Sequence, residues 1–352
     1  MVYFLLIHPR GLLLAVALLV VTTAAARPKP KAPASPANIP HLEMDGGRQL
    51  YFERNFTSQR EVKPKRGFWT KLVDAAIGEP EYRNMVRPYS ATTDSHDRVL
   101  ITDPGAYGVH VFDFEQQKYK FISHTEGKDT LQAPQCVAVD KRDNIYVTDA
   151  ESGKVFLFGA NGKFQRTLGS LKGGEGFFKR PTGIAVDSEA QRIYVTDTWR
   201  DKIFVLDMQG NVLQSIGKRG DKDGEFNFPT EVRLDGSDLI VVDAMNFRIQ
   251  VLDRSGAFRY AIGGAGDGLG HIFRPKGIGI DSEGHIYIAD AFYNNVQVFD
   301  RQGQLLYYFG KDAGIGDFLL PAGLAIDHND RIYVVDSYHR RGQVFRYVGG
   351  VK

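Results

Sequence analysis

The fold of this chain is decided by one stretch of sequence, Pro181-Thr-Gly-Ile-Ala-Val-Asp187, then Arg192-Ile-Tyr-Val-Thr-Asp197, then Lys202-Ile-Phe-Val-Leu-Asp207. These three runs of β-branched and aromatic residues are separated by turn residues, a pattern typical of strands joined by tight hairpins. A fourth run, Asn211-Val-Leu-Gln-Ser-Ile-Gly217, follows the turn at Met208-Gln-Gly210. The stretch therefore predicts four short antiparallel strands that follow one another along the chain.

The same unit recurs with a period of 46 to 48 residues. Its leading proline stands at Pro88, Pro134, Pro181, Pro229, Pro275 and Pro321, and the aspartate closing its second strand stands at Asp103, Asp149, Asp197, Asp243, Asp290 and Asp336. Four strands repeated at this period are the signature of a propeller blade. The sequence therefore predicts an all-β, six-bladed propeller with four-stranded antiparallel blades.

The sixth unit lacks a fourth strand, because the chain ends at Lys352 soon after the third. We expect a strand from before the first repeat to complete this blade and to remove its exposed edge. The favoured candidate is the strand-like segment Gln49–Phe56, and the alternative is Lys71–Gly78. Apolar residues in the second segment follow a helical period, so a short helix is expected near residues 67–77.

The repeat resembles a known family. The pattern Pro-x-Gly-Ile-Ala-Val-Asp, Ile-Tyr-Val-Thr-Asp and Arg-Ile-Gln-Val-Leu-Asp is similar to the NHL repeat, and Asn246-Phe-Arg248 matches its Asn-x-Arg. The resemblance extends over residues 88–348 and is weakest in the first unit, which has Tyr89-Ser-Ala-Thr-Thr in place of Gly-Ile-Ala-Val. It implies a six-bladed propeller of the exported bacterial type. It does not imply one function, since the family includes RNA-binding modules, receptor sensor domains and an amidating lyase.

The N-terminal residues indicate export. An apolar run at Gly11–Val21 precedes Ala24-Ala25-Ala26, the small-residue pattern of a signal-peptide cleavage site. We therefore expect a signal peptide over residues 1–26, a proline-rich disordered tether over 27–48 and a single propeller domain over 49–352. Cys136 is the only cysteine, which excludes a disulfide framework and suits a bacterial periplasm or cell surface. An uncleaved N-terminal membrane anchor is the alternative.

Nucleic acid is not the expected partner, because the formal net charge of the 352-residue chain is only +2. No metal, cofactor or catalytic residue is predicted either. The lyase relatives hold zinc with inner-strand histidines, and related lactonases hold calcium with acidic and amide side chains. Here the matching inner positions are Ser90, Cys136, Gly183, Glu231, Gly277 and Gly323, which include no histidine and one carboxylate.

Two charged residues interrupt the small residues of the inner strands. Glu231 and Arg233 lie two residues apart on one predicted inner strand, so their side chains point the same way. Lys276 lies at the start of the neighbouring inner strand, in the next unit. They form either an internal ion pair that fills the channel or an anchor for a small anionic ligand. A hydrolase or lyase acting on a small molecule in the channel is the alternative to a binding protein.

The loops at one end of the ring are the favoured binding surface. The turns between second and third strands lie on the same end as the loops between blades, and variable loops on a rigid scaffold commonly carry binding sites. The predicted site is rich in aromatic residues and arginine, as binding hot spots are. It consists of Trp199, Arg200, Phe247, Arg248, Phe292, Tyr293, Tyr338, His339 and Arg340. The expected function is non-catalytic recognition of a protein, peptide or glycan, as a scaffold or binding module.

Overall fold

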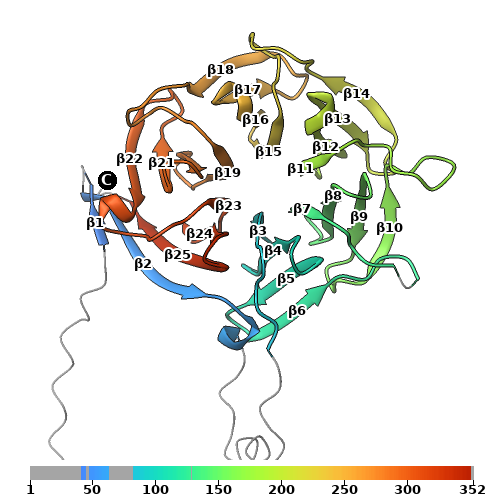
Figure 1. Cartoon of the computed structure of the whole chain (residues 1–352), viewed down its shortest axis with the longest axis horizontal. Helices are drawn as coiled ribbons and strands as arrows, with labels where there is room; N and C mark the ends of the chain where they lie inside the picture. The colour runs from blue at the N-terminus through green and yellow to red at the C-terminus, as the bar shows by residue number, and fades with distance from the viewer. Residues whose placement is uncertain (1–40, 45–46, 63–81, 128, 350–352) are drawn as a thin grey trace, which may run out of the picture. The chain divides into compact units, whose positions relative to one another are not determined.

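The computed structural model, which describes residues 41–44, 47–62, 82–127 and 129–349, places six antiparallel sheets around a common axis (Figure 1). The first strand of each sheet lies nearest the axis and the last strand lies at the rim. This confirms the predicted six-bladed propeller with four-stranded antiparallel blades.

Each repeat unit supplies its strands in order from the axis outward. Blades 1 to 3 contain β3 (Ala91–Thr93), β4 (Val99–Asp103), β5 (Gly108–Asp113), β6 (Lys118–Ile122), β7 (Pro134–Val139), β8 (Ile145–Asp149), β9 (Lys154–Phe158), β10 (Phe164–Leu168), β11 (Pro181–Asp187), β12 (Arg192–Asp197), β13 (Lys202–Asp207) and β14 (Val212–Ile216). Blades 4 to 6 contain β15 (Pro229–Asp235), β16 (Asp238–Asp243), β17 (Arg248–Asp253), β18 (Phe258–Gly263), β19 (Pro275–Ile280), β20 (Ile286–Asp290), β21 (Asn295–Phe299), β22 (Leu305–Gly310), β23 (Pro321–Ile326), β24 (Arg331–Asp336) and β25 (Arg341–Val348).

The hydrophobic core is divided among the interfaces between neighbouring blades. Every residue of β8 and of β20 is buried, because both faces of these middle strands pack against a neighbouring sheet. One apolar cluster joins blades 2 and 3 through Tyr146 and Phe204, and another joins blades 5 and 6 through Tyr287 and Phe345. The double-sided apolar pattern of the middle strands is therefore explained by burial on both faces.

Small residues on the inner strands allow the blades to approach one another at the axis. A Cβ atom added to Gly183 would lie 2.7 Å from Cα of Glu231 on the next blade, and one added to Gly323 would lie 2.6 Å from Cα of Ser90. Since such distances are shorter than any normal contact between carbon atoms, a side chain at either position would push the inner strands apart. Thr102 and Thr148 add hydrogen bonds from their hydroxyls to carbonyls of the next inner strand, 2.7 and 2.9 Å long.

Strand β2 (Gln49–Phe56) closes the ring by pairing antiparallel with β25 as the fourth strand of blade 6. The preferred closure segment is thus confirmed, with the predicted bounds; the alternative at residues 71–78 and the helix expected near 67–77 lie outside the described residues. A further strand, β1 (His41–Glu43), pairs with β2 inside the segment expected to be a disordered tether. After β2 the chain forms a short 3-10 helix, η2 (Gln59–Val62). Among the described residues no helix is long and apolar enough to cross a membrane.

Removal of β2 should destabilise the whole ring. Leu50 and Phe56 are fully buried, Phe56 packs edge-on against Phe112 of blade 1, and loss of the strand would expose the edge of β25. A chain that begins at residue 57 should melt well below one that begins at residue 41, because each lost apolar side chain costs roughly 2–5 kcal/mol. Thermal unfolding of both truncated chains provides the measurement; equal melting temperatures would contradict closure by β2.

Candidate binding face

The turns between second and third strands lie against the loops between blades, as the repeat predicts. In blade 3 the amide of Thr198 donates to the carbonyl of Arg180, and in blade 5 the amide of Ala291 donates to the carbonyl of Arg274, both at 3.0 Å. Both kinds of loop therefore form one end of the ring, which we call the loop face.

Six buried aspartates, one at the end of each second strand, hold the loop face in place. They are Asp103, Asp149, Asp197, Asp243, Asp290 and Asp336, each fully buried. Each accepts at least one backbone N–H from the loop that enters its blade, for example Arg180 N at 3.0 Å from Asp197 and Asn227 N at 2.7 Å from Asp243. Several of them also accept amides of their own turn, as Asp290 does from Phe292, so these residues fix both the turn and the loop between blades.

In blades 1, 4 and 6 a side chain of the third strand also hydrogen-bonds the buried carboxylate. Gln250 and Gln343 donate to Asp243 and Asp336 at 2.9 and 3.0 Å, and in blade 1 His110 takes the matching place beside Asp103 at 3.2 Å. Tyr119 completes a Tyr–His–Asp chain, with its hydroxyl 2.8 Å from His110 Nδ1. Burial lowers the pKa of His110 despite the adjacent carboxylate, and the ring is fully buried. Since no solvent reaches the His110 ring, the hydrogen bonds from Tyr119 to His110 to Asp103 support the fold rather than acid–base chemistry.

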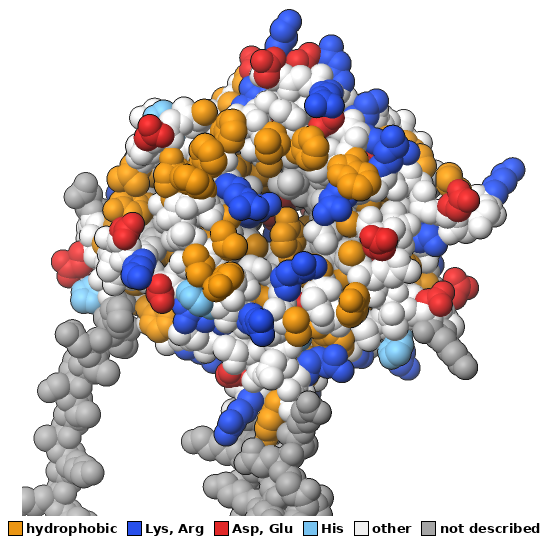
Figure 2. Space-filling model, in the orientation of Figure 1, with side chains coloured by type: hydrophobic (Ala, Val, Ile, Leu, Met, Phe, Trp, Pro, Cys, Tyr) orange, Lys and Arg blue, Asp and Glu red, His pale blue; other side chains and the backbone are white. Residues whose placement is uncertain are grey.

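Large aromatic side chains project from the loop face into solvent. Trp199, Phe292 and Tyr338 are 59%, 56% and 64% exposed, and Tyr107 matches them in blade 1. Between blades 4 and 5, Phe273 packs against Phe292 with ring centroids 4.3 Å apart and the rings tilted by 39°. We call the set the aromatic rim; it consists of Tyr107, Trp199, Phe247, Phe273, Phe292 and Tyr338. Figure 2 shows hydrophobic side chains gathered on the face viewed down the ring axis.

Two members of the rim, Tyr107 and Phe247, and the neighbouring Arg340 occupy a strained backbone conformation. Tyr107, Phe247 and Arg340 have φ of 57°, 57° and 55° at the turn position where blade 2 has Gly153. A bulky residue in this left-handed region costs of order 1 kcal/mol relative to glycine. The strain is not required by the turn itself, because Gly153 makes the same turn without it.

The other residues predicted for this surface make contacts within the protein. Arg248 donates from Nε to Asp243 at 2.9 Å, and His339 lies 2.8 Å from Asp336. The hydroxyl of Tyr293 donates to the carbonyl of Gly266 at 2.6 Å. Arg200 is half-buried over the ring of Phe177, with its Nη1 3.4 Å from Asp197. Arg248 in particular is largely enclosed by the loop, so its guanidinium is used in the fold.

Two arginines of this surface, Arg248 and Arg340, should therefore respond differently to replacement by alanine. Arg248→Ala removes a side chain that is 14% exposed and deprives Asp243 of its opposite charge, although Asn227 and Gln250 still donate to that carboxylate. The loss of one charged hydrogen bond should lower the free energy of unfolding by about 2 kcal/mol. Arg340→Ala, at an exposed position of the matching turn, should change the free energy of unfolding by less than about 0.5 kcal/mol. Urea unfolding of the two variants makes the comparison, and equal destabilisation would show that Arg248 is not part of the loop-face framework.

The channel contains the Glu231–Arg233 pair that the sequence singled out. The Nη2 of Arg233 lies 2.6 Å from Glu231 and donates to the carbonyl of Ala91, on blade 1, at 2.8 Å. Because Arg233 belongs to blade 4, its side chain crosses the channel. Burial raises the pKa of Glu231 to about 7, against the opposing charge of Arg233. The Nε of Arg233 has no hydrogen-bond partner.

Lys276 does not line the same space as this pair but a hollow of about 350 Å³ on the loop face, together with Arg87, Arg180 and Arg274. We call this hollow the basic mouth. None of its lining residues is acidic, and among the described residues no carboxylate pairs with these four side chains. The repeat predicts that the loops between blades bring Arg180 and Arg274 to this end of the ring, whereas Arg87 was not predicted. The signal was present, because in units 1, 3 and 5 an arginine directly precedes the leading proline.

A larger groove of about 1110 Å³ adjoins the basic mouth and shares Arg87, Pro104, Leu320 and Ser337 with it. We call it the side groove. Tyr107 and Tyr338 of the aromatic rim line it, together with Arg340 and His339. The loop face thus combines a small cationic hollow with a wider aromatic groove that leads away from it.

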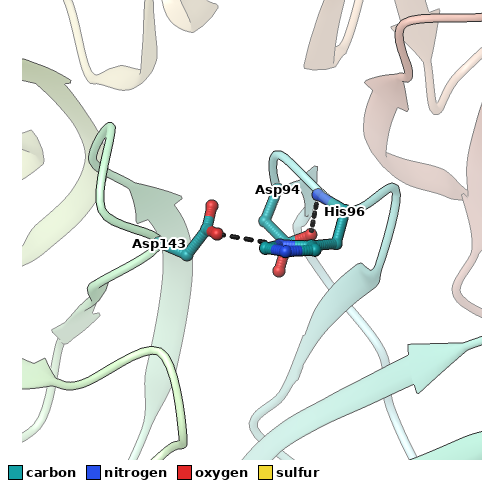
Figure 3. Close-up of side chains that lie close together, drawn as sticks. All are labelled: Asp94, His96 and Asp143. Carbon is teal, nitrogen blue, oxygen red and sulfur yellow. Dashed lines mark hydrogen bonds and ion pairs between the residues drawn. The ribbon is translucent and has the colours of Figure 1, made fainter.

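At the opposite end, one group of side chains has the composition of a metal site. Asp94, His96 and Asp143 offer ligand atoms within 4.8 Å of one another (Figure 3). These atoms already have partners in the protein: Arg98 Nε lies 2.5 Å from Asp94, and Asp143 accepts bonds from Ser95 Oγ at 2.7 Å and from His96. Although burial opposes the change, these hydrogen bonds lower the pKa of Asp143. The group joins the hairpins of blades 1 and 2, as Ser282 and Asp330 join blades 5 and 6.

Comparison with known proteins identifies the family. A family model described as "6-bladed beta-propeller" matches residues 124–217, 189–249 and 222–306, which together span more than half of the chain. The chain belongs to this family of six-bladed propellers. No curated protein matches it.

Solved structures with the same fold differ in what they do. Virginiamycin B lyase from Staphylococcus aureus aligns with a TM-score of 0.57 and 12% identity over 86% of this chain and 100% of that one. A gluconolactonase from Xanthomonas campestris aligns with a TM-score of 0.60 and 14% identity, over 92% of this chain and 100% of that one. A chain of the nidogen–laminin complex aligns with a TM-score of 0.54 and 17% identity, over 81% of this chain and 97% of that one. At these identities the likeness shows the fold alone, since the same propeller carries both enzymes and binding proteins.

Proposed function

We propose that this propeller is a binding protein whose loop face recognises a protein, peptide or glycan. The observation that carries the proposal is the aromatic rim. Matching turns of successive blades present large exposed aromatic side chains, and three of these, Trp199, Phe292 and Tyr338, are more than half exposed. Clustered aromatic residues beside arginine have the composition of interaction hot spots.

The backbone conformation of the rim supports the same proposal. Tyr107 and Phe247 keep bulky side chains at left-handed turn positions, where glycine would relieve the strain. Strain that the fold does not need is a common feature of functional surfaces. The framework beneath the rim is rigid, because buried aspartates such as Asp197 and Asp290 fix both the turns and the loops between them.

A hydrolase or lyase in the channel is less well supported. The inner strands approach too closely for side chains at Gly183 and Gly323, and Arg233 spans the space that remains. Cys136 faces Ser90, whose hydroxyl lies 3.3 Å from its sulfur, and burial raises the pKa of the thiol. A thiol that stays protonated is a poor nucleophile.

Loss of the rim should abolish capture of the partner without unfolding the protein. The variant Trp199→Ala/Phe292→Ala/Tyr338→Ala should bind its partner at least tenfold more weakly, which requires a loss of only about 1.4 kcal/mol. Quantitative mass spectrometry of proteins and glycans retained from the native envelope extract gives the comparison with the wild-type protein. The melting temperature of the variant should stay close to the wild-type value, since these side chains are exposed.

The matched control is Val212→Ala/Leu213→Ala on β14, which removes apolar side chains of similar exposure from the outer strand of blade 3. It should retain whatever the wild-type protein retains. If the rim variant and the control capture the same molecules equally, the binding surface lies elsewhere than on the rim.

We further propose that the chain is exported with cleavage after Ala26, on the strength of the apolar run at Gly11–Val21 and the alanines that follow it. Mass spectrometry of the protein purified from its native cells should find an N-terminus at or near Arg27. An intact Met1 in the membrane fraction would show an anchor instead.

A further inference from the structure

The basic mouth concentrates positive charge that the protein itself does not neutralise. Arg87, Arg180, Arg274 and Lys276 line a hollow of about 350 Å³ that contains no acidic residue. Two of them lie near aromatic rings: Arg180 is 5.4 Å from the ring centroid of Trp199, and Lys276 is 5.9 Å from that of Tyr89. Four cations gathered in a concave site raise the local concentration of anions.

The position of the three arginines is set by the framework of the ring. Each directly precedes the leading proline of its blade, and its backbone amide is held by the buried aspartate of that blade, at 2.9 Å for Arg87, 3.0 Å for Arg180 and 3.2 Å for Arg274. They come from blades 1, 3 and 5, so they approach the axis from three directions. Figure 2 shows Lys and Arg side chains around the central opening of the face.

The other mouth of the channel has the opposite character. Eight carboxylates line the hollow of about 730 Å³ at that end, with Lys141 and Arg254 as its only lysine and arginine. Many of these carboxylates accept hydrogen bonds within hairpin turns, as Asp94 and Asp281 do. The cations of the basic mouth have no such role in the fold, and Arg233 bars the channel between the two ends.

We propose that the basic mouth binds a compact group carrying at least two negative charges, made of carboxylates or phosphates. This proposal rests on the proposed function, because it assigns the charge of the ligand recognised on the loop face. Arginine suits such a group, since its planar guanidinium donates two parallel hydrogen bonds to a carboxylate or a phosphate. The volume accommodates a head group, and the adjoining side groove, with Tyr107 and Tyr338, accommodates the remainder of the ligand.

The test uses the mature protein and three probes: pyrophosphate, citrate and acetate. Isothermal titration calorimetry at low ionic strength should show one pyrophosphate or one citrate bound per chain, and acetate bound at least tenfold more weakly. The variant Arg87→Gln/Arg180→Gln/Arg274→Gln should weaken binding of the preferred probe on the order of 100-fold, because it removes three charged donors. The better probe tells whether phosphate or carboxylate is recognised.

The matched control is Lys163→Gln/Lys172→Gln/Lys179→Gln, which removes the same charge from exposed positions outside the hollow. It should bind the probe within a few-fold of the wild-type protein, and all three proteins should melt alike without ligand. The proposal is overturned if neither polyanion binds better than acetate, or if the control loses as much affinity as the mouth variant.

The rim variant Trp199→Ala/Phe292→Ala/Tyr338→Ala separates this inference from the proposed function. It should still bind the polyanion, since the variant keeps all four cations of the mouth and, among the described residues, only Arg180 of the four lies over one of the three removed rings. Loss of partner capture by the rim variant, together with no polyanion binding by the wild-type protein, would retain the binding face and reject the anionic ligand.

Discussion

A buried carboxylate at the end of each second strand is the interaction on which this ring depends. A propeller blade is held to its neighbours mainly by apolar contacts, which are not directional. Asp103, Asp197 and Asp290 add direction, because each accepts amide hydrogen bonds from the loop that enters its blade. A fully buried carboxylate is tolerated only when donors surround it, so the loop cannot leave without exposing an uncompensated charge. The same residue therefore fixes the turn, the loop and the spacing of the blades.

That constraint also determines where the candidate site can form. The amides of Arg87, Arg180 and Arg274 are held by aspartates whose side chains are satisfied by other groups, so the three guanidinium groups stay available. Arg248 shows the contrast: at the start of a third strand it lies within reach of Asp243 and is used there. Of these four arginines, the three that precede a leading proline remain available to a ligand, and the one at the start of a third strand serves the fold.

The repeat in the sequence was sufficient to predict the fold, including closure by Gln49–Phe56, because strand pattern and period leave few ways to complete the last blade. It was not sufficient to predict the contacts of individual loop residues. Trp199 lies in the turn after a second strand and Arg248 begins the third strand after the matching turn, yet Arg248 is largely enclosed and Trp199 is exposed. That difference arises from the loop between blades, which varies in length and reaches Arg248 through the carbonyl of Lys222. The same contact recurs in blade 6, where Arg341 donates to Asp336 and to the carbonyl of Asp317. Blades 3 and 5 have Lys202 and Asn295 at the matching position, so the repeat shows this contact only in part.

The two ends of the ring use charge in opposite ways, and this difference favours the loop face as the site of binding. At the hairpin end, acidic residues such as Asp281 and Asp327 accept backbone amides of their own turns and the hydroxyls of Tyr287 and Tyr333. Their charge is needed to form the hairpins. At the loop face the cations of the basic mouth make no ion pair within the described structure, although they repel one another. Like charges gathered without compensation weaken a fold, so their presence is better explained by an anion that joins them than by stability.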